Sequence, residues 1–382
     1  MRVAIFRELP HDFPGGVSNL LTVMLDYLER NGHEARVFIA DDGLAGQTQG
    51  PFVGFPTMTT SRWARSSFCL PVPQAARMRR ELEAFRPDVV HFLHPIILGA
   101  VGSYFARRQK VARVASFHTL YHDYVAHHGV RFLRRILRWW VWMVFKDCHM
   151  TLAPSVSVAD LLHEWGLKRV FVWPRGVDVE RFNPRRRSEE WRSSVRGAGG
   201  DGRPLVLYVG RLAREKNMET LVALATLLEG VHWVIVGDGP ERGSLSEAFR
   251  GASHTFTGYL SGDELATAYA SSDIFFMPSV TEGCPNAVME AFASGLPVVG
   301  AGAYGTGDLI EESSAGLTFH PDDPAEASRK IDEFLNDPAL AASFGARGRA
   351  FAESRSWDSL MAQLLKHYDK ARALNGLSPS AP

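Results

Sequence analysis

The strongest constraint on the fold is a regular alternation between short apolar runs and amphipathic segments. In the first half of the chain the apolar runs are RVAIF, EARVFIA, PDVVHFL, VARVASFH and MTLAPS, and the segment NLLTVMLDYLERNG separates the first two. Strands that are apolar along their whole length belong to parallel sheets with helices on both faces. The alternation therefore predicts an α/β domain built from βαβ units.

A second series of the same kind follows a change in composition. Residues 176–203 are rich in Arg, Gly and Pro and show no apolar period, so we interpret them as a linker region. Beyond it come PLVLYVG, VHWVIVGDGP, HTFTGYL, DIFFMPS and LPVVG. We predict two Rossmann-like domains, residues 1–175 and 204–356, whose parallel sheets face a central cleft, with ligands at the carboxyl ends of the strands. The final helix, residues 357–374, has no strand after it, and we expect it to pack on the first domain.

The composition excludes several classes of protein. At 382 residues the chain is long enough for two domains with sizeable cores. Lys plus Arg and Asp plus Glu both number 42, so no global field favours nucleic acid as a partner. Cys69, Cys148 and Cys284 are far apart and odd in number, which fits a reducing compartment and argues against a disulfide framework or a Cys-based zinc site.

The sequence also bears on localisation. The N-terminal apolar run ends at Arg7 and Glu8 and is too short for the hydrophobic region of a signal peptide. The chain has no uncharged run of ~18 apolar residues, so a transmembrane helix is not expected. We therefore expect a cytoplasmic protein.

The stretch TEGCPNAVMEAFASGLPVVG, residues 281–300, places one carboxylate in a loop and another inside a helix. Pro285 suits a first helical position, and Gly295 ends the helix before a strand. Glu290 then lies about one turn inside the helix, near free N–H groups that favour an anion. Glu282 and Glu290 would accept hydrogen bonds from hydroxyls on either side of that anion, which is the layout of a nucleotide sugar. The alternative is that Glu290 offsets the helix dipole and Glu282 is a solvated loop residue.

A second candidate segment, VGRLAREKN, begins at the end of an apolar strand. Gly210 ends that strand, and Arg211 and Lys216 lie in the loop beyond it. Two cations at the carboxyl end of a strand suit a diphosphate, since Arg can bind two oxygens and Lys acts as a point charge. The alternative is a solvated loop, which is our interpretation of Arg214.

Glycines mark two further loops. Gly15 and Gly16 follow the first strand and precede a helix, so the backbone could approach a phosphate closely there, although a plain turn needs such glycines too. The segment VGDGPERG departs from the dinucleotide pattern G-x-G-x-x-G, and Pro240 starts a helix. We therefore expect this segment to shape a nucleotide pocket rather than to bind a nicotinamide cofactor.

His118 lies just past an apolar strand of the first domain, in VASFHTLYHDY, where it would face the cleft. It could instead cap a helix or form a metal pair with His122. A zinc site needs a third ligand that we do not find in the sequence, and we find no Asp-x-Asp element of the kind that holds a metal against a diphosphate. We expect a metal-free site that uses Arg211 and Lys216, with no cofactor.

The segment FLRRILRWWVWMVFK, residues 132–146, combines basic residues with Trp and aliphatic side chains. Two interpretations fit it equally well, a helix lying on an anionic bilayer surface and a core helix with a basic solvent face. In the first case the protein would bind peripherally at the inner face of the cytoplasmic membrane. Its basic residues and tryptophans are Arg134, Arg135, Arg138, Lys146, Trp139, Trp140 and Trp142.

Together these segments resemble the retaining glycosyltransferases of family 4, which have the GT-B fold of two Rossmann-like domains. Glu282 and Glu290 match the family's E-x7-E motif, and GRLAREKN matches its Arg and Lys diphosphate loop. GGVSNLL, SFHT, WPRGVDVERFNP, VGDGP and GDELATAYASSD also match in family order, so the resemblance covers essentially the whole chain. The nearer likeness is to the branch of sulfoquinovosyldiacylglycerol synthases and GDP-mannose-dependent glycolipid mannosyltransferases. Two loops, GCPNAVMEA and YGTGDLI, differ from that branch, in which the second usually reads G-G-x-x-D-x-I.

The resemblance implies transfer of a mannose- or glucose-type hexose from a UDP- or GDP-sugar to an acceptor hydroxyl, on a lipid or glycolipid, with the α configuration kept and without a metal. Glu282 would hold sugar hydroxyls, the amides of residues 286–288 the diphosphate, and Glu290 the ribose. The implied donor-binding set is Gly15, Gly16, Gly210, Arg211, Lys216, Glu282, Cys284, Asn286, Ala287, Val288 and Glu290.

The resemblance also implies catalytic roles. Arg211 and Lys216 would stabilise the charge that grows on the leaving phosphate. His118 would orient the donor sugar or stabilise the oxocarbenium-like state, while the leaving phosphate takes the acceptor proton. The implied catalytic set is His118, Glu282, Arg211 and Lys216.

Other classes of function stay open at this point. A glycoside hydrolase also uses paired carboxylates, ~5–10 Å apart, but it has no use for a basic diphosphate loop. A noncatalytic nucleotide-sugar sensor would keep the donor-side residues but need not keep His118. A transferase acting on a soluble or polysaccharide acceptor is the further alternative. The sequence leaves the nucleotide, the hexose, the acceptor and the oligomeric state open.

Overall fold

The computed structural model describes residues 1–10, 16–58, 70–94, 96–118, 133–197 and 202–376. These residues form two structural units. The first contains the described residues up to 118, residues 133–173 and the segment from residue 358, and the second contains residues 174–357. Residues 176–203, which we interpreted as a linker, therefore lie within the second unit.

The first unit is built around an eight-stranded sheet with the strand order β3-β4-β2-β1-β5-β6-β7-β8. Neighbouring strands pair in parallel, except for β3 and β4, which are antiparallel. The central strands are buried along almost their whole length, as expected for strands with helices on both faces. The strands are β1 (Arg2–Arg7), β2 (Glu34–Ala40), β3 (Thr48–Gln49), β4 (Phe52–Phe55), β5 (Val89–Phe92), β6 (Ala112–Ser116), β7 (Met150–Ala153) and β8 (Val170–Val172).

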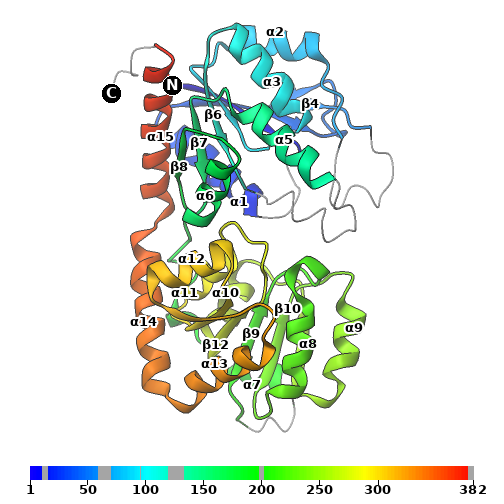
Figure 1. Cartoon of the computed structure of the whole chain (residues 1–382), viewed down its shortest axis with the longest axis vertical. Coiled ribbons are helices and arrows are strands. Elements are labelled where there is room, and N and C mark those ends of the chain that lie inside the picture. The colour runs from blue at the N-terminus through cyan, green and yellow to red at the C-terminus, as the bar shows by residue number, and fades with distance from the viewer. Residues whose placement is uncertain (11–15, 59–69, 95, 119–132, 198–201, 377–382) are drawn as a thin grey trace. The chain divides into compact units, whose positions relative to one another are not determined.

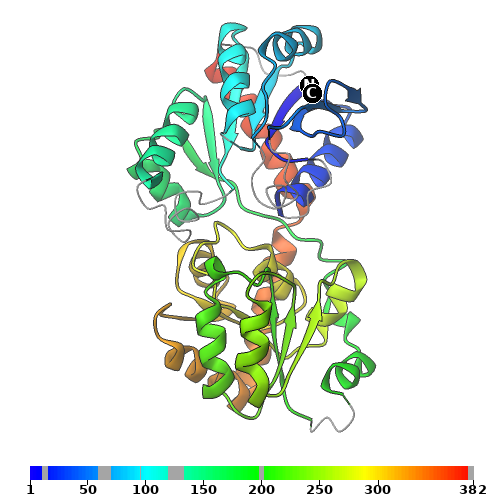
Figure 2. The same cartoon turned by 90° about the vertical axis from the view of Figure 1, so that its right-hand side faces the viewer.

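Helices lie on both sides of this sheet, as Figures 1 and 2 show. The helices are α1 (Gly16–Arg30), α2 (Ala75–Phe85), α3 (Ile97–Arg108), α5 (Leu133–Phe145), α6 (Val156–Glu164) and α15 (Trp357–Leu374). The last of them, α15, buries Leu364 and Tyr368 in the first unit, and Trp173 Nε1 donates to the carbonyl of Leu360 at 3.0 Å. The C-terminal helix therefore completes the core of the first unit.

The second unit contains a six-stranded, fully parallel sheet with the order β11-β10-β9-β12-β13-β14. Alternate residues of its strands belong to two hydrophobic clusters, so the sheet is buried on both faces. One cluster includes Leu205, Leu207, Val234, Val236 and Phe275, and the other includes Val206, Tyr208, Trp233, Ile235 and Phe276. The strands are β9 (Leu205–Val209), β10 (His232–Val236), β11 (His254–Gly258), β12 (Ile274–Met277), β13 (Val298–Ala301) and β14 (Gly316–Phe319).

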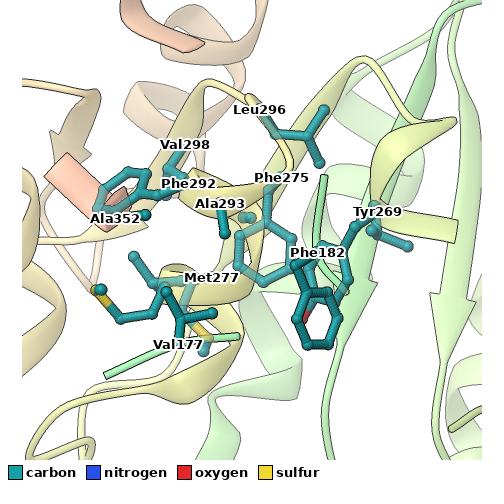
Figure 3. Packing of buried hydrophobic residues seen from close by; sticks show 14 of the residues in the cluster. Val177, Phe182, Tyr269, Phe275, Met277, Phe292, Ala293, Leu296, Val298 and Ala352 are labelled. Atoms are coloured by element: carbon teal, nitrogen blue, oxygen red, sulfur yellow. The ribbon is translucent and has the colours of Figure 1, made fainter. Parts of the chain in front are cut away.

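The helices of the second unit pack on these two faces. They are α7 (Glu189–Arg196), α8 (Met218–Leu227), α9 (Arg242–Ala248), α10 (Gly262–Ala270), α11 (Asn286–Ala293), α12 (Tyr304–Ser313), α13 (Pro324–Asn336) and α14 (Pro338–Ser354). Figure 3 shows part of one cluster, in which Phe292 of α11 and Ala352 of α14 meet strand residues such as Phe275.

The segment that we interpreted as a linker is held to the second unit by a partly buried ion pair. Arg192 of α7 donates two hydrogen bonds to the carboxylate of Asp273, at 3.0 and 2.9 Å, and a third to the carbonyl of Ser271. Phe182 contributes to the core of the second unit. This packing could not be predicted from the local composition, which is rich in Arg and Pro, because the partner of Arg192 lies far along the chain.

The strand order of each sheet reverses at one place, between β1 and β5 in the first unit and between β9 and β12 in the second. Ligands of open α/β sheets bind outside the carboxyl ends of the strands at such a reversal. The loops after β9 and β12 contain the predicted residues Arg211, Lys216 and Glu282.

Candidate active site

The loop after β9 carries the two predicted cations. Gly210 directly follows β9, and a short 3-10 helix, η3 (Arg214–Lys216), precedes α8. Asn217 connects η3 to α8 with a φ of 55°, a left-handed conformation that Asn adopts more easily than most residues. Arg211 forms an ion pair with the buried carboxylate of Glu215. The local turn therefore fixes the direction in which both cations leave the backbone.

Lys216 forms an ion pair with Glu282, which lies in the loop after β12. Ser279 Oγ donates to Glu282 Oε1 at 3.4 Å, and Thr281 Oγ1 donates to the carbonyl of Glu215 at 3.1 Å. These contacts join the two loops at the strand-order reversal, so the predicted diphosphate cation and the predicted sugar carboxylate form one cluster.

The charge state of Glu282 follows from its neighbours. Burial alone would raise the pKa of its carboxyl, but the charge and hydrogen bond of Lys216, the hydroxyl of Ser279 and the charge of Arg175 hold the pKa below its ordinary value. Glu282 is therefore ionised at neutral pH and can accept hydrogen bonds from hydroxyls.

Arg175 is a residue of this site that the sequence interpretation did not single out. It is buried, and its positive charge helps to lower the pKa of Glu282 and partly offsets the burial that raises the pKa of Cys284. The segment WPRGVDVERFNP contains Arg175, but its residues do not mark the arginine as buried. In the structure, a Cβ at the next residue, Gly176, would lie 2.8 Å from the Trp357 ring, so the backbone beside Arg175 is tightly packed.

The glycines of VGDGP serve close packing against the cation loop. A Cβ at Gly237 would lie 2.0 Å from the carbonyl oxygen of Gly210, and one at Gly239 would lie 2.3 Å from that of Leu212. The amide of Gly210 donates to the carbonyl of Val236 at 3.0 Å. This geometry explains the glycines without a dinucleotide, and the role of the segment in shaping a nucleotide pocket stays a prediction.

Helix α11 begins one residue later than we predicted. Pro285 is its N-cap, with an extended ψ of 118°, and Asn286 is the first helical residue. The amide of Val288 donates to the carbonyl of Pro285 at 3.2 Å. Among the described residues, no acceptor is found for the amides of Asn286 and Ala287, and these two N–H groups are the ones the helix offers to an anion.

Glu290 lies in the second turn of α11, near the hydroxyl of Tyr269 on α10. Burial raises the pKa of Glu290 to about 7, and the Tyr269 hydroxyl acts in the opposite direction. Tyr269 is a second residue that the sequence interpretation missed, although it stands in the quoted motif GDELATAYASSD. The two glutamates thus differ, since Glu282 is ionised and Glu290 titrates near neutral pH.

The start of α12 supports the loop of Glu282. The amide of Gly305 donates to the carbonyl of Glu282 at 3.0 Å, and a Cβ at Gly305 would lie 2.0 Å from the carbonyl oxygen of Gly283. Tyr304, in the loop YGTGDLI, has a φ of 37°, a region that favours glycine. A tyrosine is therefore held in a strained backbone conformation beside the candidate site.

The remaining predicted residues divide between the two units. Cys284 is a free thiol in the loop before α11, and burial raises its pKa. His118 and Gly16 belong to the first unit: His118 Nε2 is 2.7 Å from Ser116 Oγ, and Gly16 is the first residue of α1. Gly15 and His122 lie outside the described residues. Within those residues no group of three or more His, Cys, Asp or Glu side chains is arranged to hold a metal ion.

Two family models match the chain. Residues 14–181 match the family described as Glycosyltransferase Family 4, and residues 190–351 match the one described as Glycosyl transferases group 1. The first match lies mainly on the unit of His118, and the second covers Arg211, Lys216, Glu282 and Glu290.

Three curated relatives extend this likeness. The GDP-mannose-dependent alpha-mannosyltransferase of Corynebacterium glutamicum is 34% identical over 99% of this chain and 91% of its own length. The protein of the same name from Mycobacterium tuberculosis is 37% identical over 97% of each chain. The alpha-monoglucosyldiacylglycerol synthase of Streptococcus pneumoniae is 27% identical over 84% of this chain and 75% of its own.

A solved structure shows the same fold at much lower sequence identity. Sucrose-phosphate synthase from Thermosynechococcus elongatus has a TM-score of 0.77 and 18% identity, covering 97% of this chain and 99% of its own. The chain belongs to the glycosyltransferases of family 4 and has the GT-B fold, as the sequence predicts. It is an enzyme that transfers a hexose from a nucleotide sugar.

Proposed function

We propose that the enzyme transfers mannose from GDP-mannose to a hydroxyl of a lipid-borne acceptor, with retention of the α configuration and without a metal ion. The observation that carries this proposal is the identity of 34% and 37%, over nearly full lengths, to two proteins named GDP-mannose-dependent alpha-mannosyltransferase. The lipid acceptor is supported by the relative named as a synthase of a glucosylated diacylglycerol.

The contacts of the second unit support a role for each donor-side residue. The bond from the anomeric carbon to the diphosphate oxygen breaks, so negative charge grows on the leaving GDP. Lys216, Arg211 and the open amides of α11 offer positive charge and donors where that growth would occur. The acceptor oxygen bonds to the anomeric carbon, and its proton passes to the leaving phosphate oxygen.

The two glutamates suit the two ends of such a donor. Glu282 is ionised and paired with Lys216, so it can accept from hexose hydroxyls while the cation stays beside the diphosphate. Glu290 lies deeper along α11 and, once it has lost its proton, can accept from both ribose hydroxyls.

A donor panel tests the proposal directly. Purified enzyme is given GDP-mannose, GDP-glucose, UDP-glucose and UDP-galactose with and without an extract of neutral and phosphorylated lipids, and nucleotide release is measured. We expect acceptor-dependent release of GDP from GDP-mannose, unchanged by EDTA, and an α-mannosyl lipid by NMR. Release from UDP-glucose alone, loss of activity in EDTA with recovery in manganese, or a β product would each contradict one part of it.

The outer face of α5 supports contact with an anionic membrane. Val141, Val144 and Phe145 bury one face of this helix, whereas Ile136 is 54% exposed and Trp139 is 56% exposed. Arg135 and Arg138 are exposed on the same helix, although Arg138 also donates to the carbonyl of Glu164 at 3.0 Å. In the described part of the chain, no helix is both long enough and apolar enough to cross a bilayer.

Vesicle sedimentation tests the membrane contact. Each cation near an anionic bilayer contributes ~1 kcal/mol, so reversal of Arg134, Arg135 and Arg138 to Glu should release the protein from vesicles containing phosphatidylglycerol. The control reverses two exposed cations of the second unit, Arg250 and Arg329, to Glu. Equal binding of both folded variants, or no binding of the unaltered protein at low salt, would overturn the membrane contact.

A further inference from the structure

The loop that is predicted to bind a diphosphate also contains a buried carboxylate. Glu215 stands between Arg211 and Lys216 in this loop and is 6% exposed. A negative charge beside an anion site repels the anion, and the repulsion is strong where water is excluded. A carboxylate at this position therefore needs a compensating contact.

That contact is an ion pair with Arg211. Nη2 of the Arg211 guanidinium donates to Oε1 of Glu215, four residues along the chain. The direction of this hydrogen bond is fixed, because a guanidinium stays protonated in proteins and only donates, whereas a paired carboxylate only accepts. The Glu215 side chain is 7% exposed and the Arg211 side chain is 45% exposed. The buried partner thus restrains the half-exposed one.

Arg211 is also held at its backbone. Its carbonyl accepts from the Tyr208 hydroxyl at 3.1 Å and from the Ala213 amide at 3.1 Å. Tyr208 belongs to the hydrophobic core of the second unit. Because both the backbone and the guanidinium of Arg211 are bound, this side chain has lost most of the rotational freedom that an exposed arginine keeps.

The backbone of Glu215 contacts the neighbouring loop. Its carbonyl accepts from Thr281 Oγ1 at 3.1 Å. Thr281 directly precedes Glu282, the carboxylate that pairs with Lys216. The side chain of Glu215 therefore holds one predicted cation, and its backbone is bound to the loop that holds the other. All of these residues belong to the second unit.

The Arg211 guanidinium keeps donors for a ligand. It carries five N–H donors, and within the described residues Glu215 is the only acceptor found for them. A guanidinium can bind two phosphate oxygens through a pair of parallel donors. A donor that is already oriented does not have to be ordered while charge grows on the leaving phosphate.

We propose that Glu215 is a positioning residue that fixes the guanidinium of Arg211 in the free enzyme, so that its remaining donors are already oriented when the diphosphate of the donor binds. The part that concerns the diphosphate rests on the proposed function. The restraint on Arg211 is a property of the folded protein and is measured without a substrate.

The restraint is tested by NMR of arginine side chains in protein labelled with ¹⁵N. Relaxation of each Nε–H group gives an order parameter, and Arg211→Lys identifies the Arg211 signal. We expect a value for Arg211 near the ~0.85 of rigid backbone, and a fall below ~0.6 in Glu215→Ala. Glu215→Gln keeps an acceptor oxygen and should cause a smaller fall. A mobile Arg211 in the unaltered protein, or a value unchanged in both variants, would overturn the proposal.

Glu219 supplies a matched control. It lies in the first turn of α8, four residues beyond Glu215, and is exposed. Glu219→Gln removes the same charge as Glu215→Gln, but solvent screens a charge at this position. It should leave the Arg211 order parameter and the kinetic constants unchanged. Equal effects of the two Gln variants would show that the loss of a charge is the cause, and would overturn the role of the ion pair.

The kinetic test measures whether the restraint serves transfer. Glu215→Ala should lower kcat at least about tenfold, because Arg211 must then be ordered during the reaction. The KM for GDP-mannose should change by less than about threefold, since the loss of the restraint weakens donor binding while the loss of the repelling charge strengthens it. A merely structural role, with collapse of the loop, would raise KM strongly as well and would count against the proposal.

A double-mutant cycle with Arg211 shows whether Glu215 acts through this cation. The variant that carries both Glu215→Ala and Arg211→Ala should have a kcat/KM within about twofold of that of Arg211→Ala alone. Losses that multiply would mean that Glu215 acts independently of Arg211, and would overturn the proposal. If the unaltered enzyme transfers no mannose from GDP-mannose, the proposed function fails, and the order parameters still decide the restraint.

Discussion

Lys216 is one of the residues that join the loop after β9 to the loop after β12. Its ammonium pairs with Glu282 and lies in the loop predicted to hold the diphosphate. We expect Lys216→Ala to weaken transition-state stabilisation by roughly 2–4 kcal/mol, measured from the fall in kcat/KM, because a preorganised charge partner is lost. The free energy of unfolding should change little.

The neighbouring cation provides the control for this substitution. Arg214 stands in the same 3-10 turn and is exposed, and within the described part of the chain no hydrogen bond or ion pair joins it to Glu282. Arg214→Ala should retain the kcat/KM of the unaltered enzyme in the same assay. A loss of similar size in both variants would point to collapse of the loop instead of removal of a specific charge.

Glu290 gives donor binding a pH dependence of defined sign. Its pKa in the free protein is about 7, and the carboxyl must lose its proton before it can accept from two ribose hydroxyls. The dissociation constant for GDP-mannose should therefore rise as pH falls below 7, by up to about tenfold per unit. Calorimetric titration between about pH 5.5 and 8 measures this, and the diphosphate diester of GDP-mannose does not itself titrate there.

Glu290→Gln separates this carboxyl from other titrating groups. The variant should bind the donor more weakly at pH 8 and show an almost flat profile. An unaltered enzyme with a flat profile would mean that Glu290 is not the group that receives the ribose.

At the scale of single elements, the loop between β10 and α9 depends on the absence of a side chain. Gly237 has a φ of 129°, and a Cβ there would lie 2.0 Å from the Gly210 carbonyl oxygen. Gly237→Ala should lower the free energy of unfolding by roughly 2–4 kcal/mol and weaken donor binding, because the cation loop must move.

A second glycine of the same segment controls for the loss of backbone freedom. No heavy atom lies within 4 Å of a Cβ built at Gly243, on α9, and its φ is not in the left-handed region. Gly243→Ala should be neutral or slightly stabilising in denaturant unfolding. Equal destabilisation by both substitutions would show that close packing against Gly210 is not the cause.

The buried carboxyl of Glu8, which follows β1 and accepts from the start of α3, has the opposite relation between pH and stability to most acids. Glu8 Oε1 accepts from the amide of Gly99 at 2.8 Å, and burial raises the pKa of Glu8 to about 7 while the amides of residues 96–99 act to lower it. The folded state therefore binds a proton more tightly than the unfolded state. This contribution is present below the unfolded pKa of about 4.5 and is lost as pH rises through 7.

Glu8→Gln should remove that dependence. The amide oxygen of Gln can still accept from Gly99, but it has no proton to lose, so the variant should gain up to roughly 3 kcal/mol relative to the unaltered protein between about pH 5 and 8. Denaturant unfolding across that interval measures the difference, with the exposed Glu83→Gln as control. Parallel curves for Glu8→Gln and the unaltered protein would rule out this role.

Local patterns were enough to predict the elements around the donor-side residues. The strand that ends before Gly210 and the helix that ends before Gly295 are both specified by neighbouring residues. The structure moves the start of α11 from Pro285 to Asn286 and the start of α9 from Pro240 to Arg242. Segment 176–203 was not predicted as part of the second unit, because the order of α7 comes from Arg192 and its distant partner Asp273. Local sequence does not encode such a pair.

The environment of the site residues was the least predictable part. That Glu290 faces Tyr269, and that His118 is linked through Ser116 and His91 to Tyr368, depends on side chains brought together by the sheets. Sequence could assign a residue type to a loop, but pKa values and tautomers depend on burial and partners that only the fold supplies.

At the scale of the whole molecule, two units with separate cores predict two thermal transitions. Because the proposed GDP-mannose contacts lie in the second unit, the ligand should raise the transition temperature of that unit. At a GDP-mannose concentration a hundred times the dissociation constant, the free energy of unfolding of the unit should increase by roughly 2.7 kcal/mol. Differential scanning calorimetry with and without GDP-mannose measures this. Leu82→Ala, which opens a cavity in the first unit, should lower the other transition alone. One transition that shifts as a whole in both experiments would contradict independent cores.

The interrupted path of the chain through the first unit sets the order in which a newly made protein matures. The second unit is a single stretch, residues 174–357, whereas the first is completed only by the segment from residue 358. During translation the later unit can therefore finish folding while the earlier one still waits for α15. Because Tyr368 arrives with that helix, its contact with His91 on β5 forms only after the whole second unit has been made.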